Sequence, residues 1–185
     1  ESRSNSQMVN HMNLNGTLST TEDSLWQVQF DPSNLTLFNQ VWAIEENNFV
    51  RFGHGKIITR DFQLFNNLNQ RVLLDSENDG KGLVFSLTNF DLAELNRFYS
   101  LNDISYRAKL YDFEVHIQDI YNLKGFELYV TSDTLFLDEA PFGEITGNFE
   151  MADLHSPLTG KVFLQGKKHQ LRVVGAWLPD GGTTQ

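Results

Sequence analysis

Alternation of apolar and polar residues in the C-terminal third of the chain is the feature that most constrains the fold. Every second residue is apolar or glycine in three runs, at 145–151, 158–164 and 171–177. Successive side chains of a strand point to opposite faces, so each run predicts a strand with one apolar face. The segments between them, 153–157 and 165–169, are rich in turn residues such as Gly, Pro, Asp and Ser. The sequence therefore predicts an antiparallel meander with one continuous apolar surface.

The same alternation runs through the rest of the chain from about residue 25, in short segments at roughly ten-residue spacing. A charged, Gly-bearing hairpin loop is predicted at 75–82. Residues 89–99, NFDLAELNRFY, are different, because Asp91 is a suitable N-cap and Leu92 and Leu95 follow at helical spacing. We therefore predict an all-β fold, either a sheet, a sandwich or a barrel, with one short helical insert.

The 185-residue length allows one sizeable domain, or a large piece of a longer protein. Residues 1–16 are polar and unpatterned, and we interpret them as a flexible lead-in. We assign residues 17–179 to a single domain and 180–185 to a loose tail.

Charge and cysteine content exclude several classes of partner and site. The net charge of −10 argues against nucleic acid as a partner, because phosphate binding requires clustered Lys and Arg. It also disfavours an anionic membrane surface. The absence of cysteine excludes disulfides and zinc–thiolate sites. No apolar run approaches the roughly 20 residues that a membrane-spanning helix needs.

Motifs for metal binding and catalysis are weak. Asp75, Glu77 and Asp79 precede Gly80 as in a calcium loop, but position twelve, which needs a bidentate acid, is Ser86. The five histidines are scattered without a metal-binding spacing. We therefore expect a solvated hairpin at this segment, and neither a metal site nor a cofactor.

Two acidic pairs are the remaining candidates for catalysis, Glu45 with Glu46 and Asp138 with Glu139. Both lie in predicted turns, where charge mainly serves solubility, and only a cleft between them would make them glycosidase carboxylates. Serine-nucleophile motifs and Gly-rich phosphate loops are absent from the sequence. We expect no catalytic residues and no enzymatic activity, so the apolar face itself carries the functional signal.

Several segments together resemble the C-terminal domain of the TamB family, in the AsmA-like group of Gram-negative envelope proteins. The resemblance spans most of residues 25–178 and has no invariant catalytic signature. The segments that carry it are LWQVQF at 25–30, VWAIEENNFVRF at 41–52, LVFSLTNFDLAEL at 83–95, SYRAKLYDFEV at 105–115 and residues 142–178.

This resemblance implies an elongated, curved antiparallel sheet of the β-taco type with an apolar concave face. It further implies a periplasmic segment of a longer protein that is anchored in the inner membrane outside this segment. The implied function is non-enzymatic, in outer-membrane biogenesis: conducting phospholipid between membranes, assisting outer-membrane protein assembly, or both. The implied partners are phospholipid or other acyl chains and an outer-membrane barrel of the TamA or Bam type. We also expect the free edges of an open sheet to allow self-association.

The predicted groove lining takes one face of each alternating strand. An alternative is a sealed β-barrel or sandwich of a secreted or surface lipoprotein, which would recognise protein or carbohydrate through its loops. The opposite face of each strand becomes the lining if a register slips by one residue. The predicted lining residues are Trp26, Val28, Phe30, Leu83, Phe85, Leu87, Phe126, Leu128, Val130, Ile145, Phe149, Val162, Leu164, Leu171, Val173 and Trp177.

Overall fold

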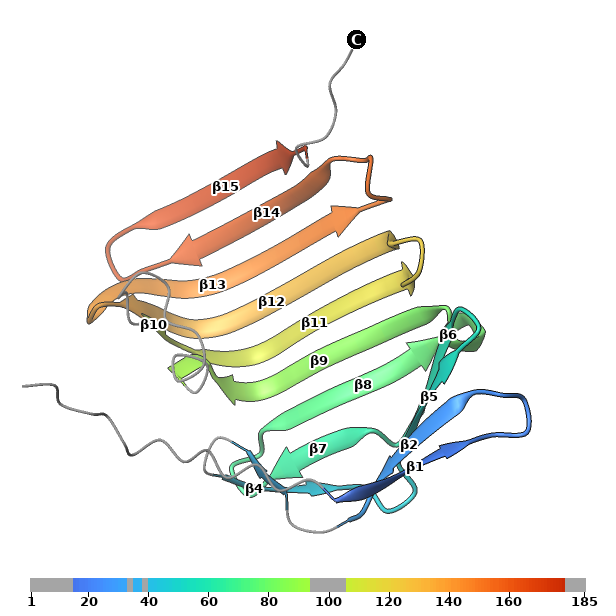
Figure 1. Cartoon of the computed structure of the whole chain (residues 1–185). Helices are drawn as coiled ribbons and strands as arrows, with labels where there is room; N and C mark the ends of the chain where they lie inside the picture. The colour runs from blue at the N-terminus through green and yellow to red at the C-terminus, as the bar shows by residue number, and fades with distance from the viewer. Residues whose placement is uncertain (1–14, 33–34, 38–39, 94–105, 179–185) are drawn as a thin grey trace, which may run out of the picture.

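A computed structural model describes residues 15–32, 35–37, 40–93 and 106–178, which form two antiparallel sheets (Figure 1). The smaller sheet has four strands in the order β1-β2-β5-β6. Its strands are β1 (Gly16–Thr20), β2 (Trp26–Phe30), β5 (Phe49–Gly53) and β6 (Lys56–Arg60).

The larger sheet has eleven strands, and its order from one edge to the other is β15-β14-β13-β12-β11-β9-β8-β7-β4-β3, with β10 paired to β12. The predicted meander is confirmed, since β11 to β15 are consecutive neighbours. The strands are β3 (Leu35–Leu37), β4 (Gln40–Ile44), β7 (Gln63–Asn66), β8 (Arg71–Glu77), β9 (Gly82–Asp91), β10 (Tyr106–Arg107), β11 (Lys109–Asp119), β12 (Lys124–Leu137), β13 (Ala140–Met151), β14 (Leu158–Gln165) and β15 (Gln170–Trp177).

Cross-strand register aligns the apolar residues of the large sheet into rows on one face. One row runs Leu74, Phe85, Val115, Leu128, Phe149, Gly160 and Gly175. The next runs Val72, Leu87, Phe113, Val130, Gly147, Val162 and Val173. A third runs Phe90, Leu110, Ser132, Ile145, Leu164 and Leu171. Because the pleat alternates, the rows between these lie on the opposite face.

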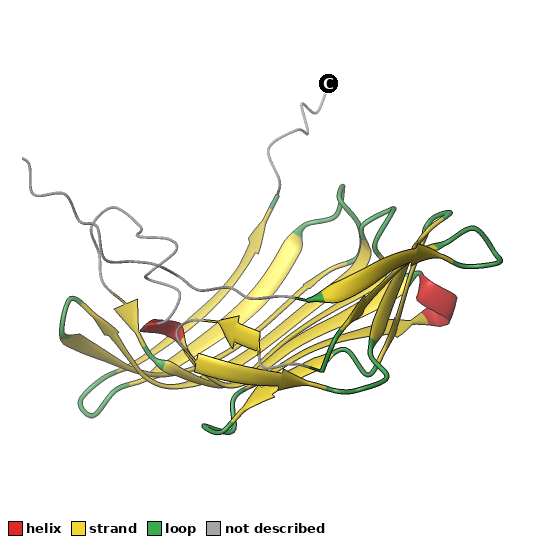
Figure 2. Cartoon of the chain, turned by 60° about the horizontal axis from the view of Figure 1, so that its bottom comes forward, coloured by secondary structure: helices red, strands yellow, loops and turns green. Residues whose placement is uncertain are grey.

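The apolar face is the concave side of the sheet. Leu35 and Trp42 on β3 and β4 join one buried cluster with Phe90 and Leu110 on β9 and β11, although β7 and β8 lie between them in the sheet. The sheet must therefore curl toward this face, and Figure 2 shows the curvature. β15 and β3 do not pair with each other, so the sheet is not closed into a barrel. The predicted elongated, curved antiparallel sheet is confirmed.

The four-stranded sheet packs against the end of the concave face formed by β3, β4 and β7, which we call the closed end. The Phe30 ring on β2 makes an edge-on contact with Phe62, with 5.6 Å between centroids. Asn48, which is fully buried, donates its side-chain amide to the carbonyls of Phe30 and Glu45, and its Oδ1 accepts from the Phe30 N–H (3.0 Å). One amide therefore joins β2 to the turn between β4 and β5, where the chain passes from one sheet to the other.

Two predicted boundaries are wrong. The charged loop predicted to begin at Asp75 begins later, because strand β8 continues to Glu77 and only the 3-10 turn η1 (Asn78–Gly80) and Lys81 separate it from β9. The helical insert predicted at 89–99 does not include residues 89–91, which complete β9. Asp91 does act as a cap, since its Oδ1 accepts from the Ala93 N–H (2.9 Å), but residues 94–99 lie outside the described part of the chain.

Candidate functional site: the open end of the apolar face

The structure places the sixteen predicted lining residues on the two sheets. Thirteen lie on the concave face of the large sheet, from β9 to β15. Ten of these belong to the three rows above, Leu83 and Phe126 flank Ile117 in a further row, and Trp177 pairs with Leu158. The other three, Trp26, Val28 and Phe30, share one face of β2 in the smaller sheet. Phe30, Leu87 and Val130 pack against the buried cluster, so other parts of the chain partly cover them.

Exposure of the apolar face increases from the closed end toward β15. Phe90 on β9 is 2% exposed, whereas Val173 and Trp177 on β15 are 50% and 60% exposed. All eight residues of β15 are exposed, although three of them are large and apolar on the concave side. An exposed apolar surface of this kind is typical of a site that binds an apolar partner.

Strand β11 also contributes to the lining, although none of its residues is among the sixteen predicted ones. Phe113, Val115 and Ile117 lie between the predicted residues of β9 and β12 on the same face. The Phe113 ring also contacts Phe85 edge-on, with centroids 6.3 Å apart. Adding β11 makes the apolar face continuous across neighbouring strands.

A shallow depression of about 210 Å³ lies at the open end of this face. Its floor is formed by glycines: the Phe149 ring lies so close above Gly160 that a Cβ there would overlap it, whereas a Cβ at Gly175 would meet open space. Val173 and Trp177 line the depression beside Gly175. Gly160 thus allows the Phe149 ring to lie against β14, and Gly175 leaves open space beside it on β15.

Most charged residues of the large sheet lie on the convex face; Asp119 and Lys124, which pair at the ends of β11 and β12, are exceptions. Between the apolar rows, one row carries Asp75, His116, Glu127 and Glu150, and another carries Glu114 and Lys161. His116 Nε2 lies 2.8 Å from Glu114 Oε1. None of the residues in the three apolar rows carries a charge. The concave rows are thus uncharged, whereas the convex rows mix charged residues with apolar ones such as Val84 and Val174. A one-residue change of register would exchange the two faces.

Two turns at one set of strand ends are held by aspartates. The Asn122 side chain and the N–H groups of Asn122 and Tyr121 donate to Asp119, and these bonds lower the pKa of Asp119 below its ordinary 3.8. In the turn between β13 and β14, the Ser156 hydroxyl and the His155 N–H lower the pKa of Asp153 in the same way. Both carboxylates are thus used as turn acceptors.

Within the described ranges, no group of three or more His, Asp or Glu side chains is placed to hold a metal ion. The described residues also include no helix with the length and apolar character needed to cross a bilayer. Comparison with family models, with curated proteins and with solved structures finds no match for this chain.

Proposed function

We propose that this chain is a non-enzymatic module that binds the acyl chains of phospholipids on its concave face and conducts them between membranes. One observation carries the proposal: the uncharged, apolar rows continue across β9 to β15 and become most exposed where the sheet is open. An apolar face of this extent is a liability in water unless something covers it. Acyl chains are suitable because they need no hydrogen-bonding partners.

The expected binding energy is favourable, and it does not fix the lipid at one position. Each buried methylene contributes about 0.8 kcal/mol, so covering a few of them gives useful affinity. Because the rows contain no charged group, no single position would hold a chain in place by an ion pair. A lipid could therefore pass from one row to the next with its apolar contacts replaced in kind.

The resemblance to the TamB family supports a periplasmic location and a role in outer-membrane biogenesis. In this proposal the module is part of a longer, inner-membrane-anchored protein that works with an outer-membrane barrel of the TamA or Bam type. The same face would also accept the apolar side of an amphipathic strand, which is how the module would assist outer-membrane protein assembly.

Native mass spectrometry of the purified chain, with solvent extraction of what co-purifies, tests the proposal. We expect phospholipid or fatty acid in stoichiometric amounts, and its loss when Phe149 is replaced by Arg. A lipid-free mass that persists after incubation with phospholipid vesicles would contradict the proposal. Bound peptide in place of lipid would favour the assembly role over conduction.

A further inference from the structure

β15 is the longest edge strand in the described part of the chain. It has eight residues, all of them exposed, and no described strand pairs with its outer side (Figure 1). The edge strands β1, β3 and β6 are shorter, with five, three and five residues. Natural sheets keep their edges from pairing by short length, charges, prolines or bulges. β15 has one charged residue, Arg172, with neither a proline nor a register break against β14, so its edge is open to pairing.

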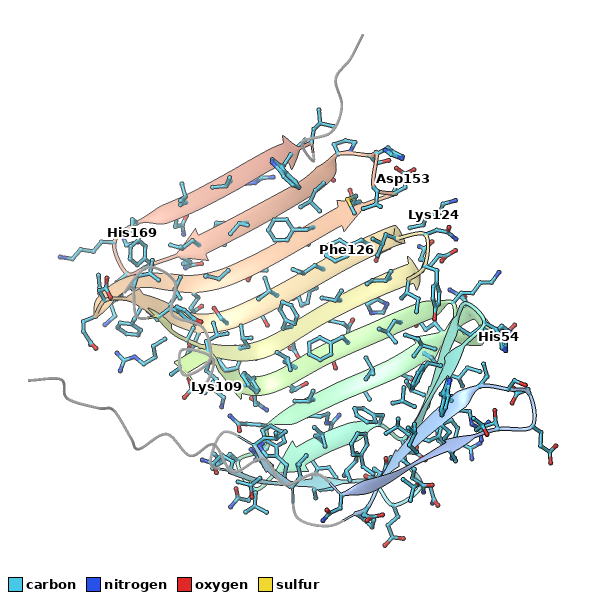
Figure 3. All side chains as sticks on the ribbon, viewed as in Figure 1. His54, Lys109, Lys124, Phe126, Asp153 and His169 are labelled. Carbon is cyan, nitrogen blue, oxygen red and sulfur yellow. The ribbon has the colours of Figure 1, made fainter. Side chains whose placement is uncertain are left out.

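One hydrogen bond of the β14–β15 hairpin shows which backbone groups of β15 point outward. In the turn that carries His169 (Figure 3), the Gly166 N–H donates to the His169 carbonyl (2.9 Å), so these opposite residues form a hydrogen-bonded pair. Such pairs alternate with non-hydrogen-bonded pairs along an antiparallel ladder, and the register is unbroken from here to Trp177. The odd-numbered residues of β15 therefore bond to β14. The outward N–H and C=O groups belong to Gln170, Arg172, Val174 and Ala176.

These outward backbone groups determine how a second copy of β15 can pair with the first. They belong to residues whose side chains lie on the convex face, because Leu171, Val173 and Trp177 between them lie on the concave face. In an antiparallel pairing about a two-fold axis, outward groups must be opposite outward groups. Convex residues then pair with convex residues. The concave faces of the two copies therefore lie on the same side, and the apolar face of one continues into that of the other.

We propose that two copies of this chain form a two-fold symmetric dimer by antiparallel pairing of β15 with β15. A second copy is the occupant because this edge complements itself. With Val174 opposite Val174 of the second copy at the axis, Val173 lies opposite Gly175, where a Cβ would meet open space. This is a non-hydrogen-bonded pair, in which side chains approach most closely, so the valine fills the space that the glycine leaves.

The same register matches the remaining side chains of the two edges. Leu171 lies opposite Trp177, and these side chains are 54% and 60% exposed in the single chain. Arg172 lies opposite Ala176, so the two arginines do not face each other. A register centred one residue earlier would leave Trp177 without an opposite residue of β15. Pairing centred at the valine thus covers the apolar side chains of both copies.

Analytical ultracentrifugation of the whole chain over a range of concentrations tests the dimer. Pairing of one strand makes a small interface, and such interfaces are weak, so we expect dimer to form at high micromolar concentration. Val174→Pro removes the two hydrogen bonds at the axis and no bond to β14, because the Val174 N–H points outward. We expect the dissociation constant to rise about 5- to 150-fold. Val174→Thr keeps the N–H and the β-branched shape, and is the matched control.

The thermal midpoint of Val174→Pro at low concentration separates loss of pairing from loss of folding. A sedimentation coefficient that does not change with concentration would overturn the proposal. A dimer that Val174→Pro leaves as strong as the wild type would overturn the assignment to this edge. The pairing uses the strand edge and does not depend on what the concave face binds.

Single cysteines test the register independently, because the chain has no cysteine of its own. Val174→Cys places two thiols opposite each other, with Cα atoms about 5.5 Å apart, a distance that suits a disulfide. In Val173→Cys the two thiols are diagonal neighbours at about 7–8 Å, which a disulfide does not span. We expect covalent dimer under mild oxidation for Val174→Cys and little for Val173→Cys. Equal yields would overturn ordered pairing, and a higher yield for Val173→Cys would overturn this register.

Discussion

Val173 and Val174 offer the sharpest mutational test, because they are adjacent, chemically identical and exposed to a similar degree, 50% and 59%, on opposite faces of β15. Full burial of a valine side chain contributes about 1.5–3 kcal/mol, so covering the exposed half of Val173 contributes about half of that. Burial of the lipid surface that covers Val173 contributes a comparable free energy. Val173→Arg should therefore cost about 1.5–3 kcal/mol of binding energy, or roughly 10- to 150-fold in affinity.

Val174→Arg should leave lipid affinity within about twofold of the wild type, since that side chain points to the convex face. Both variants should keep wild-type unfolding midpoints within a small margin, because each position is already half exposed in the sheet. The assay is equilibrium binding of a zwitterionic lysophospholipid, measured by calorimetry on both variants and the wild type. Equal losses in the two variants, or no loss in Val173→Arg, would refute the assignment of the binding face.

Three further predictions concern the scaffold. Asn48→Ala should destabilise the fold by about 2–4 kcal/mol in urea unfolding, because it leaves buried backbone groups unpaired. Asn47 is exposed, so Asn47→Ala should have little effect, and similar unfolding midpoints for the two variants would contradict this prediction. Asp138 and Glu139 both have positive φ (45° and 69°) in a two-residue hairpin loop, so Asn-Gly at these positions should raise stability by about 1 kcal/mol, and an unchanged thermal midpoint would argue against strain there. The pKa of Asp119 is lowered in the folded state, so this carboxylate stabilises the fold above pH 3.8, and the stabilisation is lost as the pH falls through the folded-state pKa. The loss of unfolding free energy in Asp119→Ala should therefore shrink in acid. A loss that does not depend on pH would contradict this linkage.

The sequence predicted the C-terminal half well because its strands are long and strictly alternating. A pattern of period two determines which side chains share a face, and antiparallel hairpins with short turns fix the register between neighbours. The faces of Phe149, Val162 and Val173 followed from this alone, and the structure places them on one side. The omission of Val115 was an error of selection, since its strand has the same pattern.

Sequence reasoning was weaker where the chain changes sheets. Strands β4 and β5 are separated by a short turn and look like a hairpin, but they belong to different sheets, and buried Asn48 holds the crossing. A polar residue in a predicted turn carries no sequence signal of complete burial. The end of β9 was also predicted wrongly. Asn89 has a positive φ (54°), and this backbone conformation lets the strand continue to Asp91 with Phe90 on the apolar face.

Site-specific photo-crosslinking in a Gram-negative cell tests the central claim most directly. A photoreactive amino acid would be placed at Leu128, Val162 or Val173 on the concave face, and at Tyr129, Phe163 or Val174 on the convex face of the same strands. After irradiation of periplasmically expressed chain, the account predicts phospholipid adducts by mass spectrometry at the three concave positions and none at their neighbours. Adducts at both faces alike, or only protein adducts at the concave positions, would contradict a lipid-conducting groove.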